Sequence, residues 1–395
     1  MSQQTSNAPA RLNRDASSLV SLAQAFQASG SRVEDIYWES LLGQLLVKLM
    51  QNQQEEKIEQ ALEHLRAASG ESHDLLIEQA ETHSESMRLT ANGQTFDALL
   101  VLAPIAAWSR FNIPFGPLST DKAQALRQAF AAHIASDQAA IAVAPKLYSL
   151  DQMPRNFSRT RLLLNQLANT ALDLPPPRGN ALLDAEIPPL LADTRYLVFA
   201  IVVPEAQTVF KWQQPEAPSS LRGEALASWH AATAPVLANL LPGCAYEVLL
   251  PDAYYVTHRE ADKSIRPLSL EAAVSWLEVN GELSPSELSA TIALCGEQEA
   301  EEYRIGFARK NSREIVYGCV WPLFDKHEQQ DQEAELEQIV RILNKLGVLQ
   351  INKLAGLLPL DFCEDCGSPY FPTSAGELVH AEPPQEALDA PAHFH

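Results

Sequence analysis

Apolar residues near the start of the chain recur every three or four positions, which is the spacing of one face of an α-helix. Gly30 follows the first such pattern, where a helix C-cap is expected, and a capping-box sequence comes directly after it. Another helical pattern ends at Gly70, in the same cap position. We therefore expect a polar, disordered arm over residues 1–11 and a helical segment over residues 12–82.

The pattern changes from helical spacing to alternation after Ser84. Apolar side chains stand at alternate positions on both sides of the dipeptide Asn92-Gly93. This dipeptide favours the tight turn of a two-stranded hairpin, because both of its residues readily adopt positive φ. The alternation therefore predicts an antiparallel hairpin at the start of the first sheet.

Three apolar strand patterns each end in a proline, at Pro104, Pro204 and Pro322. A helical pattern follows each of them, and after the first two helices another apolar strand ends in a proline. The parallel predicts an internal repeat of a strand–helix–strand unit. The third copy is partial, because residues 346–362 have no clear strand pattern. The helices expected in the three copies cover residues 120–135, 221–240 and 334–346.

Strands that alternate with helices of this length indicate an α/β protein whose helices pack on mixed sheets. Two further strand patterns, at 302–310 and 313–321, predict an antiparallel pair. The proline-rich stretch between the first two copies is a candidate linker. The expected order is a first α/β repeat at 83–173, the linker at 174–192, a second repeat with the partial third at 193–358, a Cys-x-x-Cys knuckle at 359–381 and a disordered tail at 382–395.

Cys363 and Cys366 form a Cys-x-x-Cys-Gly sequence that looks like half of a zinc ribbon. Tetrahedral zinc needs two more ligands, and His380 is the nearest histidine along the chain. The sequence therefore predicts a zinc knuckle at Cys363, Cys366 and His380, with two free surface cysteines as the alternative. The fourth ligand is left open among His327, His393, His395 and Cys319.

Basic residues follow the second strand of each complete copy, at equivalent places in the repeat. Ligands of open α/β sheets bind beyond the carboxyl ends of strands. Arginines there, ahead of helix N-termini expected near Arg161 and Leu270, would hold phosphate or carboxylate. The pattern predicts an anion-binding groove between the copies, with ion pairs that pin the copies together as the alternative. The candidate residues are Arg155, Arg159, Arg161, Arg259, Arg266 and His258.

The charge and composition narrow the choice of partners. The 395-residue chain has 29 Lys and Arg against 50 Asp and Glu, a formal net charge of −21, so its field repels phosphate backbones and anionic lipids. No apolar run reaches the roughly 20 residues that span a bilayer, and the N-terminal stretch has no apolar core of a signal peptide. Five cysteines fit reduced thiols better than a disulfide framework. We expect a cytoplasmic protein that binds neither nucleic acid nor membranes.

Several segments together give the chain a family resemblance: SGSRVEDIYWESLL, LAPIAAWSRFNIPFG, LPDAYYVTHREADKSIRP, EEYRIGFARK, VYGCVWPL and LDFCEDCGSPYFP. From about Arg14 to His380 the chain resembles a family of uncharacterised bacterial proteins, known as domain of unknown function 2863. The resemblance implies a bacterial, cytosolic protein that forms one full-length unit. It transfers no activity, catalytic residue, cofactor or partner.

No complete catalytic constellation is visible, because the sequence has no Walker loop, no G-x-G-x-x-G and no G-x-S-x-G motif. We therefore expect a non-enzymatic interaction or regulatory module with a zinc-stabilised knuckle and an unidentified protein partner. The alternative is an enzyme or binder that holds an anionic small molecule between the repeats, with His258 as acid or base. A third hypothesis, that the acidic surface mimics nucleic acid, rests on net charge alone. The oligomeric state is left open.

Overall fold

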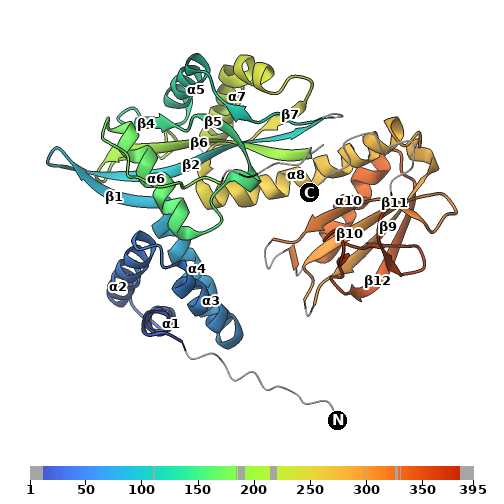
Figure 1. The fold of residues 1–395 in the computed structure, drawn as a ribbon, viewed down its shortest axis with the longest axis horizontal. Coiled ribbons are helices and arrows are strands. Elements are labelled where there is room, and N and C mark those ends of the chain that lie inside the picture. The colour runs from blue at the N-terminus through green and yellow to red at the C-terminus, as the bar shows by residue number, and fades with distance from the viewer. Residues whose placement is uncertain are drawn as a thin grey trace, which may run out of the picture.

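The computed structural model describes residues 12–109, 112–183, 185, 192–213, 220–297, 299–324, 328–329 and 331–382. The arm expected at residues 1–11 lies outside the described residues, as does all but the first residue of the tail expected at 382–395. The described chain forms two α/β units (Figure 1). Helices of the N-terminal segment lie beside the first unit, and a long helix joins the first unit to the second.

In the described part of the N-terminal segment, four helices pack around a shared core of leucine, isoleucine and alanine side chains. Gly70 does not end the third helix, as its cap position suggested, but begins a fourth. The reason is that the Ser69 side chain accepts a hydrogen bond from the backbone N–H of Ser72 and so caps a new helix. The helices are α1 (Arg14–Gln27), α2 (Arg32–Gln51), α3 (Glu55–Ala68) and α4 (Gly70–Glu85).

β1 (Ser86–Ala91) and β2 (Gln94–Trp108) form the predicted hairpin. The turn residues Asn92-Gly93 have φ values of 51° and 77°, as a type I′ turn requires. β2 does not end at Pro104, however, but continues past it. Pro104 faces the gap between two short neighbouring strands, where its carbonyl oxygen accepts a hydrogen bond from the N–H of Leu249. Its missing N–H therefore breaks no bond of the sheet.

β2 pairs antiparallel with β6 (Ala192–Pro204) in the middle of a sheet of eight described strands. Two short strands that follow β2 in the chain pair with β6, and two that follow β6 pair with β2. The pairing is symmetric about the cross-strand pair Ala103 and Leu197. Residues 105–108 of β2 pair with one short strand, and residues 199–202, at the same distance beyond Leu197 in β6, pair with another. The short strands are β4 (Ala140–Val143), β5 (Lys146–Ser149), β7 (Ala245–Val248) and β8 (Asp252–Ala253), and β3 (Gly116–Pro117) pairs with β5.

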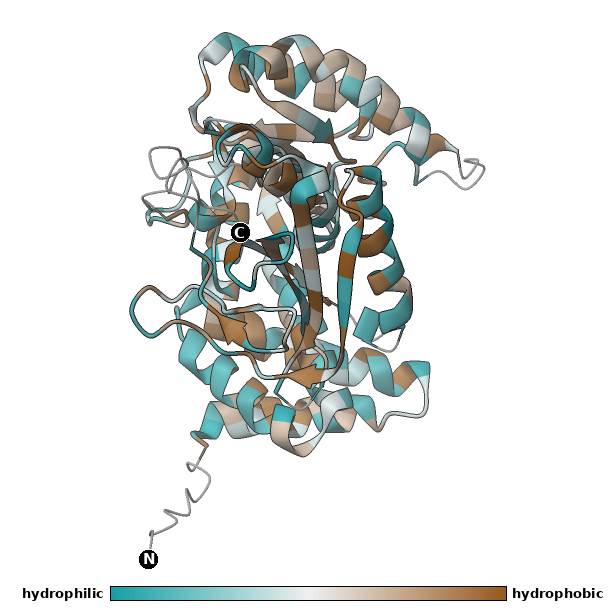
Figure 2. Ribbon diagram, turned by 90° about the vertical axis from the view of Figure 1, so that its right-hand side faces the viewer, coloured by the Kyte–Doolittle hydropathy of each residue, from teal (hydrophilic) through white to brown (hydrophobic). Residues whose placement is uncertain are grey.

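Helices cover both faces of this first sheet (Figure 1). α5 and α7 pack on one face, and α6 and the first half of α8 pack on the other. The central strands are thus buried on both faces, which explains their nearly unbroken apolar sequences. Figure 2, seen from the side of the second unit, shows brown stretches on strands inside the molecule, whereas the helices carry both colours. The elements are α5 (Thr120–His133), η1 (Leu150–Gln152), α6 (Phe157–Ala171), α7 (Leu221–Leu240) and α8 (Tyr254–Val279).

The described second unit is a four-stranded sheet in the order β11-β10-β9-β12, with α10 and the second half of α8 packed on it. β10 and β11 form the predicted antiparallel pair. Residues 346–362, which have no clear strand pattern, contain β12, and β12 lies parallel to β9. β12 is an edge strand with few buried side chains, so it lacks the alternation that marks a half-buried strand. The elements are η2 (Pro285–Glu287), β9 (Leu288–Cys295), β10 (Glu302–Arg309), β11 (Ile315–Pro322), α10 (Gln332–Lys345) and β12 (Gln350–Leu358).

The structure confirms the mixed α/β class. The strands of residues 83–173 and 193–253 belong to one sheet, whereas the strands of residues 288–358 form a second sheet, reached through α8. Beyond β12 the chain adds a small hairpin of β13 (Phe371–Pro372) and β14 (Leu378–Val379). Among the helices that the structure describes, none combines the length and apolar character needed to cross a membrane.

Candidate functional site

The side chains of Cys363, Cys366 and His380 gather at one point near the end of the described chain. Their potential ligand atoms all lie within 4.8 Å of one another, and Cys366 Sγ is 3.3 Å from His380 Nε2. Two sulfurs and one imidazole nitrogen are the donor types of a structural zinc site. The three residues that the sequence analysis singled out therefore form a group that could hold a metal ion.

The main chain around the two cysteines folds into a tight turn. The backbone N–H of Cys363 donates to Ser368 O at 2.8 Å, and the N–H of Gly367 donates back to Cys363 O at 2.9 Å. Gly367 has a φ of 72°, which glycine adopts without the strain that a side chain would cause. The turn is what brings both sulfurs to the same place.

His380 reaches the cysteines because the chain reverses direction after them. Phe371 pairs with Val379, and Pro372 pairs with Leu378, in the hairpin of β13 and β14. His380 directly follows the second strand of this hairpin. The hairpin therefore returns the imidazole to the cysteine turn.

Arg304 of β10 anchors the base of the cysteine turn. Its side chain is buried, and Nη1 donates to the carbonyl oxygens of Asp361 at 2.6 Å and Tyr370 at 2.9 Å. Nε donates to the Glu302 carboxylate at 2.6 Å, so the buried charge is balanced. The guanidinium carbon also lies 4.9 Å from the ring centroid of Phe362. One arginine thus ties both ends of the turn to the second sheet.

Phe371 fixes the hairpin on the same sheet. Gly306 of β10 and Gly318 of β11 are direct cross-strand neighbours. A Cβ on Gly318 would overlap the Phe371 ring, and a Cβ on Gly306 would lie 2.5 Å from Pro372 O. The two glycines therefore leave the space that β13 occupies.

These supporting residues do not stand out as site residues in the sequence. The available signal is the strand EYRIGFAR itself, which places Arg304 and Gly306 inside an otherwise apolar pattern. Arginine is seldom fully buried without a partner, and an interior strand glycine often marks a close backbone approach. Both features indicate that another segment packs on β10, but neither indicates which one.

Hydrogen bonds lower the pKa of the Cys366 thiol from its ordinary value. The largest cause is the hydrogen bond with the Ser368 side chain, followed by that with the Ser368 backbone, while the Asp365 charge acts in the opposite direction. A lowered pKa favours the thiolate, which is the form that binds metal.

No fourth ligand joins this group among the described residues. Cys319 is buried in the core of the second unit, where its sulfur lies 3.8 Å from Ser269 O. Burial raises the pKa of Cys319 to about 12, which keeps it a thiol at neutral pH. The other candidates, His327, His393 and His395, lie outside the described residues.

The residues expected to bind an anion make separate contacts within the protein. Arg161, buried on α6, donates to the carbonyl oxygens of His83 and Ser86. Arg259 on α8 pairs with Glu81 at 2.9 Å. Both arginines therefore hold the C-terminal end of α4 against the first unit.

Two arginines at the start of α6 are exposed. Arg155 pairs with Asp151 at 2.9 Å, and its side chain is 69% exposed. Arg159 is exposed as well, and its side chain has no polar partner among the described residues. Of the five arginines, Arg159 is thus the one that the described protein leaves available for another molecule.

The candidate anion-binding residues lie on or near α6 and α8. The N-terminus of each of these helices binds a carboxylate of the protein itself. Glu55 accepts hydrogen bonds from the backbone N–H groups of Phe157 and Ser158 at the start of α6. Glu85 accepts one from the N–H of Tyr255 at the start of α8. Burial raises the pKa of Glu85 to about 7, although the Tyr255 bond acts in the opposite direction. Helix N-termini attract anions, as expected, but these two are occupied from within the chain.

α8 begins at Tyr254, and not near Leu270 as expected. Pro267 lies inside the helix, where it lacks the N–H that would bond to Lys263 O. Nε of Arg266 donates to that carbonyl oxygen instead, at 3.5 Å. The helix can therefore continue through the proline. His258, Arg259 and Arg266, which were expected to precede a helix, lie within α8.

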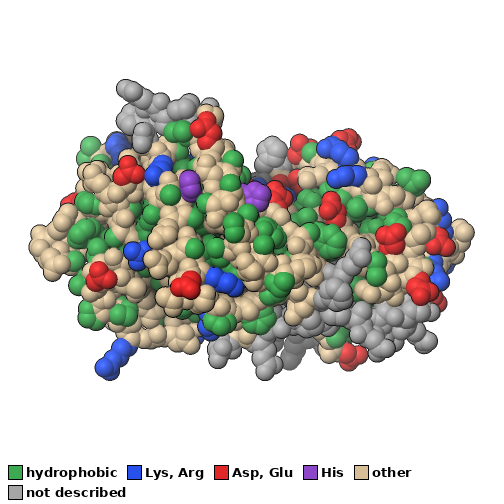
Figure 3. Space-filling view, turned by 90° about the horizontal axis from the view of Figure 1, so that it is seen from above, with side chains coloured by type: hydrophobic (Ala, Val, Ile, Leu, Met, Phe, Trp, Pro, Cys, Tyr) green, Lys and Arg blue, Asp and Glu red, His purple; other side chains and the backbone are tan. Residues whose placement is uncertain are grey.

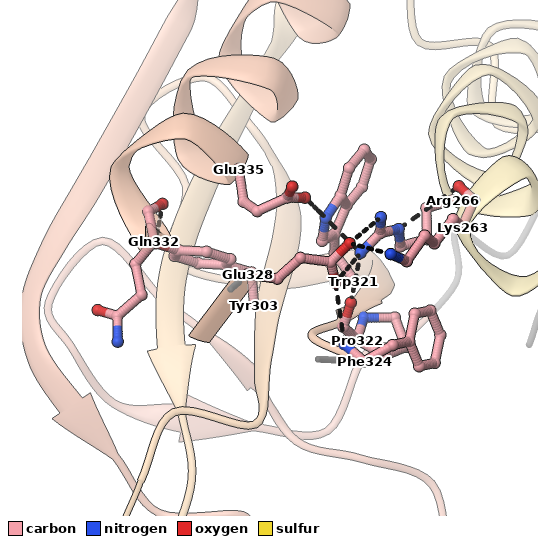
Figure 4. Close-up of polar contacts among 9 residues, drawn as sticks. All are labelled: Lys263, Arg266, Tyr303, Trp321, Pro322, Phe324, Glu328, Gln332 and Glu335. Atoms are coloured by element: carbon pink, nitrogen blue, oxygen red, sulfur yellow. Dashed lines mark hydrogen bonds and ion pairs between the residues drawn. The ribbon is translucent and has the colours of Figure 1, made fainter. Parts of the chain in front are cut away.

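Arg266 joins α8 to the end of β11 and to the segment beyond it (Figure 4). Nη1 and Nη2 donate to the two carboxylate oxygens of Glu328 at 3.1 and 3.2 Å, and Nη1 donates to Pro322 O at 2.7 Å. The guanidinium carbon lies 4.9 Å from the Trp321 ring centroid. Burial acts to raise the pKa of Glu328, but hydrogen bonds from Arg266 and from the N–H of Phe324 outweigh it and lower the pKa. Arg266 therefore forms an ion pair within the protein, which was the alternative to an anion-binding site.

His258 lies between two tyrosine rings. The ring centroids of Tyr196 and Tyr254 are 4.9 and 4.6 Å from that of His258. Burial lowers the pKa of His258 to about 4, so the imidazole is neutral at pH 7. A general acid or base works best with a pKa near the operating pH, so this surrounding suits packing better than catalysis.

A family model described as "Protein of unknown function (DUF2863)" matches residues 4–394. No curated protein and no solved structure matches the chain. The family match covers nearly the whole sequence, which confirms the resemblance noted between Arg14 and His380.

Proposed function

We propose a function from the geometry of the chain's own residues, because the chain belongs to the DUF2863 family of proteins of unknown function, and that family supplies no activity. In our proposal it is a non-enzymatic interaction or regulatory protein whose second unit is stabilised by zinc at Cys363, Cys366 and His380. The single observation that carries the metal proposal is the convergence of the three ligand atoms within 4.8 Å of one another.

The donor set supports zinc over a hard cation. Magnesium and calcium take oxygen ligands, whereas zinc binds thiolate sulfur and imidazole nitrogen. The lowered pKa of Cys366 favours the thiolate that such a bond needs. A bound ion would link the cysteine turn to the end of β14, in a segment that packs on the sheet through Phe371, Val379 and Ala381. His327, His393, His395 or a water molecule would complete the tetrahedron.

The contacts of the basic residues support a structural role for them and so favour the non-enzymatic reading. Arg161 and Arg259 hold α4, Arg266 holds the end of β11, and His258 is neutral and enclosed. Groups that are bound by the protein in this way are less available for substrate than free ones.

We also propose that the first unit arose from two copies of one strand–helix–strand–strand–helix unit. The copies would be β2-α5-β4-β5-α6 and β6-α7-β7-β8-α8. The two short strands of each copy pair with the long strand of the other copy. The symmetry of the pairing about Ala103 and Leu197 supports this. In this alignment Pro104 corresponds to Val198 and not to Pro204, so the shared prolines would be a coincidence of sequence.

A reducing, bacterial cytoplasm is the setting we propose for the protein. All five cysteines lie in the described part of the chain and are free thiols. Free thiols persist in reducing compartments, where they can serve as metal ligands.

Elemental mass spectrometry of the purified, untagged protein tests the metal proposal. We expect about one zinc per chain, lost in Cys363→Ser and reduced in His380→Ala. Cys244→Ser is the matched control, because Cys244 is a free thiol of the first unit, and it should leave the zinc content unchanged. A protein prepared without chelators that contains no metal would overturn the proposal.

The rival function, an anionic metabolite held by the arginines, is tested by thermal shift. Phosphorylated metabolites that bind the folded protein should raise its melting temperature. Arg159→Ala should abolish such a shift without breaking a described ion pair. Arg313→Ala, at an exposed arginine outside the candidate set, is the control and should leave the shift unchanged. A flat response across a metabolite library would eliminate the rival.

A further inference from the structure

A cavity of about 270 Å³ lies where β6, α8 and β11 meet, at the junction of the two units. Taking about 30 Å³ for each water-sized group, it holds a molecule of roughly nine non-hydrogen atoms. Figure 3 shows that the surface is indented between the two units. Ile265, Val320 and Phe324 give the cavity an apolar wall.

Two buried hydroxyl groups of the lining interact at most with each other and have no other hydrogen-bond partner among the described residues. They are Oγ1 of Thr194, a residue that is 4% exposed, and the phenol oxygen of the fully buried Tyr196. Buried polar atoms nearly always have a partner, because leaving one unpaired is unfavourable. A single bond between the two leaves hydrogen-bonding capacity on both oxygens that a ligand can use.

Asp262 adds a carboxylate to the lining, and it has no hydrogen bond or ion pair to a described residue. The other charged groups of the lining are already paired, Asp193 with Arg195 and Arg266 with Glu328. Arg266 acts on Asp262 through its charge, without a hydrogen bond between the two side chains. The lining charge that remains for a ligand is therefore negative.

We propose that this cavity binds a small, largely apolar molecule with one protonated amine, which pairs with Asp262 while the hydrocarbon body contacts the apolar wall. The hydroxyls of Thr194 and Tyr196 can each donate or accept a further hydrogen bond to it. A cationic ligand also suits the field of a chain with a net charge of −21, whereas an anion would be repelled. The inference does not depend on the metal centre.

Binding of such a cation weakens as the pH falls. Burial raises the pKa of Asp262 to about 6, with the Arg266 charge acting in the opposite direction. The neutral carboxyl cannot pair with a cation, so at pH 5 only about one protein in ten is competent and the apparent Kd is about tenfold higher than at pH 7.5. Of the neighbouring groups, Asp193 is ion-paired, Tyr196 has its pKa raised by burial, and His258 titrates near pH 4. The lining from η1 and β11 carries no charge.

Isothermal titration calorimetry on the full-length protein tests the proposal with three probes of similar size: 2-phenylethylamine, 2-phenylethanol and phenylacetate. We expect the amine to bind at least about tenfold more tightly than the alcohol at pH 7.5, and phenylacetate to bind most weakly. Asp262→Asn should reduce amine binding to the level of the alcohol. Glu278→Gln removes the same charge from an exposed position of α8 and should leave the binding of all three probes unchanged.

A filled cavity gives a second test of the location. Ile265→Trp should abolish the binding of both the amine and the alcohol, because its side chain occupies the space beside Asp262. Undiminished amine binding by Asp262→Asn or by Ile265→Trp would overturn the proposal. A preference for phenylacetate, or no binding of a panel of aryl and alkyl amines of this size, would also overturn it. Should Asp262→Asn fail to fold, the wild-type protein still decides: a Kd that does not rise between pH 7.5 and pH 5 contradicts it.

Discussion

The aromatic ring of Phe371 lies against the backbone of Gly318, in a space that exists because position 318 has no side chain. This contact fastens the C-terminal hairpin to β11, and the cysteine turn and His380 lie on either side of it in the sequence. Together with the hydrogen bonds of Arg304, it joins the candidate metal centre to the second sheet. Contacts of the protein itself therefore hold the three potential ligand residues in place.

Gly318→Ala should loosen the hairpin, because the new Cβ overlaps the Phe371 ring. We expect the free energy of unfolding in urea to fall by roughly 1–3 kcal/mol, the usual cost of overpacking. Gly223→Ala on α7 is the control, since a Cβ there meets nothing within 4 Å and alanine favours a helix, so its stability should rise slightly. Equal stability of Gly318→Ala and the wild type would contradict the packing argument.

Arg304→Gln should weaken both the second unit and the metal site. The change removes the donors to Asp361 O and Tyr370 O and leaves Glu302 without its partner. Breaking a buried ion pair costs roughly 3–5 kcal/mol, measurable by urea denaturation. Competition with a chelator should also show faster zinc loss than in Arg313→Gln, a control at an exposed arginine. Unchanged zinc retention would mean that Arg304 supports the sheet but not the site.

His258 should make the protein less stable in mild acid. Its folded pKa of about 4 lies below the ordinary 6.5, so its contribution is present above pH 6.5 and is lost as the pH falls toward 4. The shift corresponds to roughly 2–3 kcal/mol at pH 4.5. The difference in unfolding free energy between the wild type and His258→Gln should shrink by that amount between pH 7 and pH 4.5. His64→Gln, at an exposed position, should show no such change.

Glu85 should make the protein less stable as the pH rises through neutral. Its folded pKa of about 7 lies above the ordinary 4.5, so it favours folding at low pH and this contribution is lost as the pH rises from 4.5 through 7. Glu85→Gln keeps an acceptor for the Tyr255 N–H but cannot ionise, so at pH 8 it should be more stable than the wild type by roughly 1–3 kcal/mol. Glu78→Gln, on the exposed side of α4, is the control. Parallel pH profiles for Glu85→Gln and the wild type would refute this account.

The elements with local signals could be predicted from sequence. α7 covers the expected residues 221–240, and the Asn92-Gly93 turn forms as its φ preferences dictate. The three residues of the group that could hold a metal ion could also be named, because Cys-x-x-Cys and a nearby histidine lie within one short segment. In each case the interactions that decide the outcome connect residues close together in the chain.

Other features depend on residues that are distant in the sequence. The course of β2 through Pro104 is possible only because β7 and β8 leave a gap beside it, and the N-terminus of α6 attracts Glu55 rather than an external anion. The junction cavity likewise combines Tyr196 and Asp262 from two elements that no motif connects.

The sequence by itself therefore determined the α/β class, the hairpin and the group of two cysteines and one histidine that could hold a metal ion. The tertiary structure alone decided which charged groups are paired within the protein and which remain available. The physical reason is that periodicity and turn preferences act over a few residues, whereas the pairing and burial of a charge depend on every segment that packs around it. Arg266 and Asp262 show this within one turn of α8: the first is neutralised by Glu328, and the second faces the cavity without a partner in the described part of the chain.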